Sequence, residues 1–473
     1  MKKKLYLYII HCLWLSIFFI FSISCNKKSI IIGNETLAFS TDTLKFDTVF
    51  TTLGSVTRSF KVYNHLNKKI NINNIRLENK DQSFFRMNID GTPTKNISDI
   101  EIASNDSIYV FVALTIDPNK DSLPFVINDK ILFSLEGEEH SVALQAYGQN
   151  AHYIYDSVLS SQTWVNDLPY VILGSGALVD TGAILTIQKG CRIYMNATAK
   201  LYVAGTLFIY GTKEDSVIFQ GNRLDRDYFG YKNYPGEWGG IHFLGTSKQN
   251  ILNYTILKNG GGLDATVYVQ PVTNIDKPVV QMNQCKIENS AGYGVLCFNT
   301  NIELNSCLIH TCGLQNLALI EGGNYQINHC TIATYGGIGI NHAQQPSVAV
   351  INYRDTSITG FVGANLNAQF RNCIIDGSLD NELFINKKGN WDYNVEFTNC
   401  LIKRKADFSI ANTNQLILNQ DPLFKDIAKW DFHIPLTSPA KGNGQYILKA
   451  ELMNDLDGVP RLNPPSIGCY EAN

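Results

Sequence analysis

The chain has few charged residues and no excess of basic ones. Charged side chains make up 17% of its 473 residues, with 39 Lys and Arg against 42 Asp and Glu. Without a basic excess the sequence lacks the electrostatic footprint of a nucleic-acid binder, and we expect no nucleic-acid partner. Helical periodicity is missing as well, which argues against helical and leucine-rich repeats. A hydrophobic fraction of 45% excludes a disordered chain.

The common catalytic motifs are also missing. HExxH, GxSxG and Walker-type loops do not occur, and no repeat carries the paired acids that polysaccharide lyases and hydrolases use. Asp455-Leu456-Asp457-Gly458 lacks the later ligands of a calcium loop and is typical of a turn. We therefore expect no metal site and no cofactor.

The N-terminus is typical of an exported protein. Three lysines follow Met1, residues 5–23 are almost wholly apolar, and Ser24 precedes Cys25. This end resembles a bacterial lipobox, which implies a signal peptide over residues 1–24 and lipid on Cys25. The alternative is a transmembrane anchor ending near Cys25, since such a run could just span a bilayer. Residues 25–36 would then form a tether.

An internal repeat is the strongest signal in the sequence. Five short apolar runs carry a central cysteine, and they recur about every 22 residues. The cysteines are Cys285, Cys307, Cys330, Cys373 and Cys400. Short alternating strands at this period predict a parallel β-helix, in which the cysteines stack inside as small apolar residues. A metal site is the alternative, but the cysteines lie a whole coil apart.

Two further details follow from the repeat. Asn283, Asn305 and Asn328 occupy equivalent positions, and we expect them to stack at one turn in a left-handed conformation. Between Cys330 and Cys373 the run around Val350 has Tyr353 in the cysteine position, which predicts an additional coil there.

Different patterns flank the repeat. Residues 37–150 hold about seven alternating strands, which predict an immunoglobulin-like β-sandwich. Residues 151–425 would form the β-helix, and residues 426–473 a C-terminal closing segment. The fold class predicted is all-β, with 36 glycines and 11% aromatics supporting many strands and turns.

The sandwich, the repeat and the tail ending in Gly468-Cys469-Tyr470 together resemble the lipid-anchored right-handed parallel β-helix proteins of Bacteroidota. That resemblance implies an outer-membrane location, with the membrane face left open. It implies no single activity.

Two sets of side chains are candidate sites. Counting along the coils places Asn299, Glu321 and His342 in one column, so Glu321 and His342 could perform acid–base chemistry or form a salt bridge at a strand end. Residues 221–240 form an insertion rich in rings and charges, which suits sugar binding unless the loop buries its own rings. Its candidate ligand-binding residues are Arg226, Asp227, Tyr228, Tyr231, Tyr234, Glu237 and Trp238.

These features favour a non-enzymatic, lipid-anchored protein that displays a surface for a glycan or an envelope protein partner. A polysaccharide lyase or glycoside hydrolase on the same scaffold is the first alternative, and a structural spacer is the second.

Overall fold

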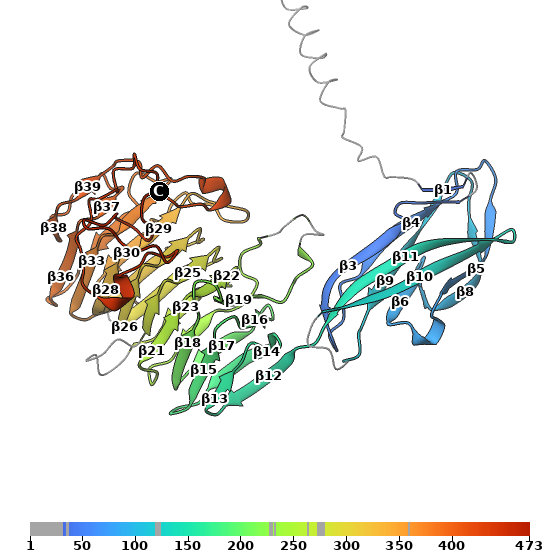
Figure 1. The fold of residues 1–473 in the computed structure, drawn as a ribbon, viewed down its shortest axis with the longest axis horizontal. Helices are drawn as coiled ribbons and strands as arrows, with labels where there is room; N and C mark the ends of the chain where they lie inside the picture. The colour runs from blue at the N-terminus through green and yellow to red at the C-terminus, as the bar shows by residue number, and fades with distance from the viewer. Residues whose placement is uncertain are drawn as a thin grey trace, which may run out of the picture. The chain divides into compact units, whose positions relative to one another are not determined.

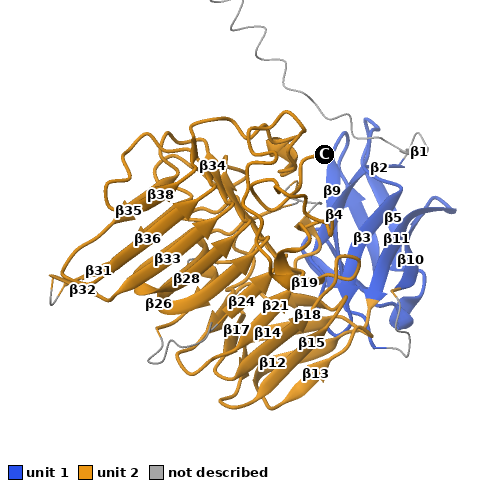
Figure 2. Cartoon of the chain, turned by 60° about the vertical axis from the view of Figure 1, so that its left-hand side comes forward, with its two compact units in different colours: residues 1–118, 125–148 blue, residues 119–124, 149–473 orange. Residues whose placement is uncertain are grey.

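The computed structural model describes residues 32–34, 37–118, 124–226, 230, 233–262, 264–271, 280–357 and 360–473. The chain divides into two compact units, which we describe separately (Figure 2). Unit 1 covers residues 1–118 and 125–148, and unit 2 covers residues 119–124 and 149–473.

Unit 1 consists of two sheets. The first sheet contains, in spatial order, β1 (Ile32–Asn34), β2 (Leu37–Phe39), β4 (Arg58–Tyr63), β9 (Ser107–Leu114), β6 (Phe85–Ile89) and β7 (Thr92–Thr94). The second contains β3 (Thr43–Phe50), β11 (Glu138–Gln149), β10 (Phe125–Leu135), β5 (Ile70–Leu77) and β8 (Asn96–Ile102). One short 3-10 helix, η1 (Lys80–Gln82), follows β5.

A single apolar core joins the two sheets, because alternate residues of each strand point inward. On β9 the side chains of Val110 and Val112 are fully buried. Phe133 of β10 contacts Phe39 of β2, with ring centroids 4.9 Å apart. The alternation read from the sequence therefore produces two sheets packed face to face.

Unit 2 is built on one parallel sheet whose strands form three ladders (Figure 1). The first ladder contains the later halves of β12 (His152–Leu159) and β14 (Tyr170–Val179), then β17 (Lys200–Val203), β20 (Ile241–Phe243), β23 (Ala265–Val269), the first halves of β26 (Tyr293–Asn305) and β28 (Leu317–Asn328), β30 (Val348–Ile351) and β35 (Leu383–Asn386). The second contains β13 (Gln162–Trp164), β15 (Ile184–Gln188), β18 (Thr206–Tyr210), β21 (Asn250–Asn253), β24 (Val280–Asn283), the later halves of β26 and β28, β33 (Leu366–Arg371), β36 (Tyr393–Thr398) and β38 (Asn412–Asn414). The third contains the first halves of β12 and β14, then β16 (Arg192–Met195), β19 (Val217–Gly221), β22 (Thr255–Lys258), β25 (Lys286–Glu288), β27 (Leu308–His310), β29 (Thr331–Thr334), β34 (Ile374–Gly377), β37 (Leu401–Ile402) and β39 (Ile417–Leu418).

The chain visits the three ladders in turn. In the first coils β15 pairs with β18 and β18 pairs with β21, so each strand lies beside the strand three places later. The inward side chains of all three ladders form one continuous core. The protein is therefore all-β, as predicted: its described residues form strands, turns and a few short 3-10 helices.

The five repeat cysteines form the predicted interior stack. All five are buried and free of disulfides. Each thiol approaches a backbone carbonyl of the coil before it, for example Cys373 Sγ to the Ile327 oxygen at 3.3 Å and Cys307 Sγ to the Met282 oxygen at 3.4 Å. Burial raises the pKa of Cys330 well above its usual value, so the thiol stays protonated.

The asparagines form a hydrogen-bonded ladder, but their backbone differs from the prediction. The Asn305 amide donates to Asn283 Oδ1 at 2.8 Å, and the Asn328 amide donates to Asn305 Oδ1 at 3.1 Å. The left-handed residues are the next ones along the chain, Ser306 with φ 50° and His329 with φ 51°. The asparagines themselves end strands, where an extended backbone lets their amides point along the ladder.

The expected coil around Tyr353 does not form. Ile327 pairs with Phe370 and Thr331 pairs with Ile374, which places Cys373 directly after Cys330 in the stack. One long coil therefore carries an insertion that includes an antiparallel hairpin of β31 (Tyr353–Thr356) and β32 (Gly360–Gly363). The prediction failed because this insertion is about as long as a coil and is also rich in apolar residues, so the apolar pattern of the sequence is the same for both.

The C-terminal tail, residues 420–473 after β39 (Ile417–Leu418), covers the outer side of the third ladder. Phe432, Leu456 and Cys469 pack on Leu308 and Ala333. A second cluster joins Ile434, Ala440 and Ile467 to Ile374 and Leu401. The tail contains two 3-10 helices, η3 (Ile427–Lys429) and η4 (Ala450–Leu452).

The acidic turn in the tail is occupied by the protein's own backbone. Asp455 is buried, and its carboxylate accepts the N–H groups of Asp457, Val459 and Glu471 at 2.8 to 2.9 Å. The turn predicted for this motif is confirmed. In the part of the chain that the structure describes, no helix is long and apolar enough to cross a membrane.

Candidate functional site

The insertion at residues 221–240 buries its tryptophan in the core. Trp238 is 0% exposed and belongs to the core of unit 2. Its ring lies nearly parallel to Phe219, with centroids 6.1 Å apart, and its indole N–H donates to the Lys258 carbonyl at 2.7 Å. The prediction that Trp238 binds a ligand is therefore wrong, because its side chain has no surface to offer.

The loop's charges are engaged with each other. Arg226 Nε lies 2.6 Å from Glu237 Oε1, and the Asn259 amide donates to the other carboxylate oxygen at 3.4 Å. Burial raises the pKa of Glu237. The Arg226 guanidinium also lies 5.2 Å from the ring centre of Tyr234, a residue that is 43% exposed. The candidates outside the described residues stay predictions: Cys25, Asp227, Tyr228 and Tyr231.

Glu321 and His342 are not partners. Glu321 binds Arg354 Nε at 2.7 Å, whereas His342 Nε2 binds Glu382 at 2.9 Å. The predicted column assumed that Ile338 points inward, but Ile338 is 53% exposed and lies in the insertion after β29. The proposed acid–base pair is therefore wrong, because Ile338 was counted as a ladder residue, whereas Leu317 pairs with Val348 of β30.

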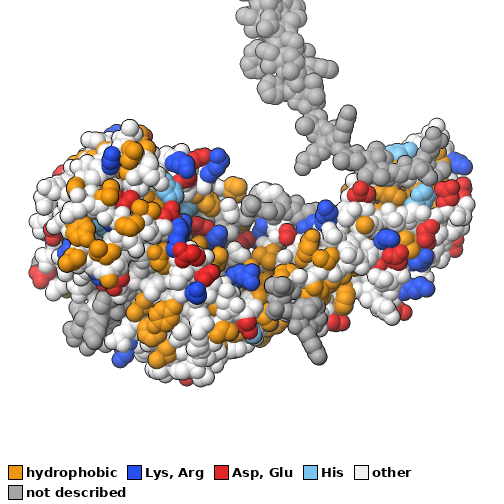
Figure 3. All heavy atoms as spheres, in the orientation of Figure 1, with side chains coloured by type: hydrophobic (Ala, Val, Ile, Leu, Met, Phe, Trp, Pro, Cys, Tyr) orange, Lys and Arg blue, Asp and Glu red, His pale blue; other side chains and the backbone are white. Residues whose placement is uncertain are grey.

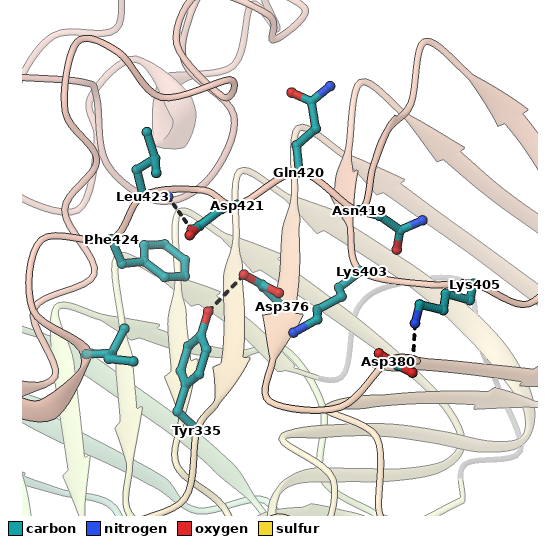
Figure 4. A pocket seen from close by; sticks show the side chains of 11 residues that line it. Tyr335, Asp376, Asp380, Lys403, Lys405, Asn419, Gln420, Asp421, Leu423 and Phe424 are labelled. Carbon is teal, nitrogen blue, oxygen red and sulfur yellow. Dashed lines mark hydrogen bonds and ion pairs between the residues drawn. The ribbon is translucent and has the colours of Figure 1, made fainter.

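A pocket of about 550 Å³ opens between the third ladder and the tail (Figure 4). Its walls come from the segment after β29, from β34 and the loop after it, and from the residues around β37 and β39. The lining residues are Tyr335, Asp376, Asp380, Lys403, Lys405, Asn419, Gln420, Asp421, Leu423, Phe424 and Ile427.

The register of the third ladder explains where the pocket lies. His310, Ala333 and Asp376 are consecutive outward residues of this ladder. The tail packs over Ala333 through an apolar cluster. One coil later the outward residue is the polar Asp376, and Phe424 of the tail instead meets the edge of Tyr335, with centroids 6.4 Å apart at 86°. The space left beside Asp376 is the pocket.

Asp376 is the most perturbed acid of the pocket. It is 5% exposed, and the Tyr335 hydroxyl donates to Asp376 Oδ2 at 2.8 Å. Burial raises the pKa of Asp376 to about 6. Burial also raises the pKa of Tyr335, which therefore remains a hydrogen-bond donor at neutral pH. Asp376 can consequently gain or lose a proton close to neutral pH.

The remaining polar groups surround Asp376 with both signs of charge. Lys405 and Asp380 form an ion pair of 2.8 Å at the exposed rim. Lys403 donates to a backbone carbonyl of β34, and Asp421 accepts a backbone N–H of the tail at 2.8 Å. In the view of Figure 4, Asp421 lies with Asp376 and Tyr335 at one end of the pocket, and the Lys405–Asp380 pair lies at the other.

A buried carboxylate holds the loops next to the pocket. Glu382 is 0% exposed and accepts the N–H of Ser347 at 3.0 Å and the N–H of Leu379 at 2.7 Å. The His342 contact completes this set. Because Leu379 belongs to the loop that follows Asp376, these bonds fix one wall of the pocket.

Sequence reasoning missed the residues that line the pocket. Tyr335, Asp376 and Asp421 lie on separate coils and on the tail, and no spacing links them. The one available signal was Asp376 itself, an acid directly after the buried Ile375 in a strand whose neighbours are apolar.

The set of side chains does not form a metal centre. No group of three or more His, Cys, Asp or Glu among the described residues could hold a metal ion. On the face drawn in Figure 3, acidic and basic side chains of unit 2 are interspersed, so this face carries no field of one sign. The lining itself offers hydrogen-bonding groups and the rings of Tyr335 and Phe424.

No protein-family model matches the chain, and no curated protein matches it. Solved structures to which it is similar include the catalytic unit of a thermostable GH87 α-1,3-glucanase from Streptomyces thermodiastaticus, with 6% identity, a TM-score of 0.28, and coverage of 76% of this chain and 89% of that one. A GH87 α-1,3-glucanase catalytic domain in complex with tetrasaccharides is 8% identical, with a TM-score of 0.26 and coverage of 80% and 90%. A family 123 glycoside hydrolase from Clostridium perfringens is 9% identical with a TM-score of 0.18, and the match spans 25% of this chain and only 26% of that one.

Proposed function

We propose that this protein is a lipid-anchored protein of the outer membrane that binds a glycan in the pocket beside Asp376. The pocket carries the proposal. It is the place among the described residues where a buried carboxylate, its Tyr335 partner and several amide and charged groups line one cavity.

We infer that unit 1 is an immunoglobulin-like sandwich and that unit 2 is a right-handed parallel β-helix. Two sheets with a shared core support the first inference. Parallel pairing of each early strand with the strand three places later supports the second, since a coil of three strands gives that connectivity. Lipid on Cys25 would hold both units at the membrane surface.

The chemistry of the pocket suits a sugar. The Asp421 carboxylate can accept hydrogen bonds from hydroxyl groups, and the Gln420 amide can both accept and donate them. The rings of Tyr335 and Phe424 offer apolar surface to the C–H face of a pyranose. Ligand sites commonly occupy about 300–1,000 Å³, and this pocket falls within that range. A single sugar unit of a longer chain would fit the open rim.

A polysaccharide-active enzyme is the second candidate, and one observation favours it. A carboxyl group with a pKa of about 6 can donate a proton to a glycosidic oxygen near neutral pH. Asp421 lines the same pocket and supplies a second carboxylate. Binding without cleavage is our first choice, because the two carboxylates already accept hydrogen bonds from the protein, Asp376 from Tyr335 and Asp421 from the Leu423 N–H.

The experiment compares binding and cleavage on the protein without its signal peptide. Affinity electrophoresis through laminarin, dextran, alginate and polygalacturonate measures retardation, and a reducing-sugar assay measures cleavage. We expect retardation by at least one polysaccharide, weakened about tenfold in Asp376→Asn, with no product released. Asp392→Asn, which changes an exposed acid outside the pocket lining, is the matched control.

The outcomes separate the candidates. Equal retardation of wild type and Asp376→Asn, or no retardation in any gel, would contradict binding in the pocket. If wild type releases product and Asp376→Asn does not, the protein is an enzyme and the proposal of a binding protein is wrong.

A further inference from the structure

The outer face of the first sheet of unit 1 carries two exposed rings. Tyr109 and Phe111 are alternate residues of β9 and point away from the core, whereas Val110 between them is fully buried. Tyr109 is 44% exposed and Phe111 is 39% exposed. Their ring centroids are 5.7 Å apart, and the ring planes differ by 19°. Two nearly parallel rings therefore lie next to each other on the surface.

Polar side chains flank the rings on both neighbouring strands. On β4, Lys61 is opposite Tyr109 and Ser59 is opposite Phe111. On β6, Asn88 is opposite Phe111. The Lys61 ammonium lies 4.7 Å from the ring centre of Tyr109. The rings are thus central in the sheet, bordered by donors and acceptors that can reach a ligand lying across them.

The fold does not require aromatic residues at these two positions. The core of unit 1 is formed by the inward residues of both sheets, and neither Tyr109 nor Phe111 belongs to it. The two rings are free to serve a purpose other than packing.

We propose that Tyr109 and Phe111, with Lys61, Ser59 and Asn88, form a polysaccharide-binding surface on unit 1. The two rings would stack on successive sugar units, and the polar residues would bind the hydroxyl groups. This site is independent of the pocket beside Asp376, since the two lie in different units. It would make the protein a binder of a glycan chain at two places.

The size and the surroundings of the surface favour a sugar over a protein. A ring that is two-fifths exposed presents on the order of 100 Å². Two such rings make an apolar patch on the order of 200 Å², smaller than the patches of several hundred Å² that mark protein contacts. Lys61 and the polar residues on either side of the rings also make this face unsuited to burial in an apolar contact. Pyranose rings need only this combination of a small apolar surface and a polar rim.

The test uses the protein without its signal peptide and affinity electrophoresis through laminarin, xylan and polygalacturonate. The double variant Tyr109→Ala/Phe111→Ala should lose at least half of the retardation shown by wild type. Tyr147→Ala is the matched control, because Tyr147 is also exposed, at 41%, but lies on the second sheet. Both variants should melt at the wild-type temperature, since neither change touches the core.

Three results would overturn the proposal. They are retardation of the double variant equal to wild type, no retardation of wild type in any gel, and a change in oligomeric state of the double variant in sedimentation, which would identify a second copy as the occupant. The comparison is repeated in the Asp376→Asn background. A loss caused by the Tyr109 and Phe111 changes that persists there belongs to unit 1, whatever the pocket does.

Discussion

The Tyr335 hydroxyl donates a hydrogen bond to the Asp376 carboxylate at 2.8 Å, although 41 residues separate the two in the sequence. They meet because Tyr335 directly follows β29, and β29 and β34 are neighbours in the third ladder. The same neighbourhood buries Asp376, and burial raises the pKa of its carboxyl group to about 6.

The stability of the protein should fall as the pH rises through the range in which Asp376 ionises. The pKa is about 6 in the folded state and about 3.9 in an unfolded chain, so between pH 4 and pH 6 the folded state holds the extra proton. Relative to Asp376→Asn, which does not titrate, wild type should lose up to about 3 kcal/mol across this window and nothing further above it. Urea unfolding of both proteins at pH 4, 5, 6 and 7 measures the difference. A difference that does not change with pH would contradict the burial argument.

Removing the Trp238 side chain should destabilise the protein without affecting a ligand. Trp238→Ala leaves a cavity in the core and an unpaired Lys258 carbonyl, and we expect a cost of about 3–5 kcal/mol. Tyr234→Ala in the same loop should cost about 1 kcal/mol or less, because Tyr234 is 43% exposed. Chemical denaturation compares the two. Similar small losses for both would place Trp238 at the surface.

The stacked cysteines should be slow to react in the native protein. All the described cysteines are buried, and burial raises the pKa of Cys285, Cys307, Cys330 and Cys373. Labelling with a thiol reagent should be slow until denaturant is added and complete afterwards. Cys330→Ala should cost about 1 kcal/mol through a small cavity. Rapid labelling of the folded protein, or disulfides among these residues, would be incompatible with the stack.

The asparagine ladder should be sensitive at its centre. Asn305 is fully buried and bonds to Asn283 and Asn328, so Asn305→Ala leaves the buried Asn328 amide without its acceptor and removes one donor from Asn283 Oδ1. We expect a loss of about 2–4 kcal/mol, against less than about 0.5 kcal/mol for the exposed Asn367→Ala on β33. Thermal unfolding distinguishes the two variants, and equal melting temperatures would mean that the ladder adds no stability.

Lipid attachment depends on Cys25, if the proposal for the N-terminus is correct. Cys25→Ala should abolish incorporation of a fatty-acid probe in a bacterial expression host, while Cys330→Ala should leave it intact. The reason is chemical, since the thiol of the residue after Ser24 would be the lipid acceptor. Labelling of Cys25→Ala equal to wild type would favour the transmembrane anchor.

The sequence by itself determined the features that repeat. Because the coils have nearly one length from Cys285 to Cys330, equal spacing places equal residues on one face, and both the cysteine stack and the bonds between Asn283, Asn305 and Asn328 follow from it. Alternation of apolar residues likewise predicted the two-sided strands of unit 1, such as β9.

Only the tertiary structure decided which side chains meet where the repeat breaks. The segment between β29 and β30 removed His342 from the column of Glu321, and the pairing of β29 with β34 brought Asp376 next to Ala333. The tail then covered Ala333 but left Asp376 beside a pocket. Local patterns cannot specify such contacts, because they depend on the length of an insertion and on the docking of a segment from the far end of the chain. Trp238 entered the core for the same reason. Burying its indole beside Phe219 lowers the free energy of the folded protein, and the sequence of the loop alone does not show that Phe219 lies within reach.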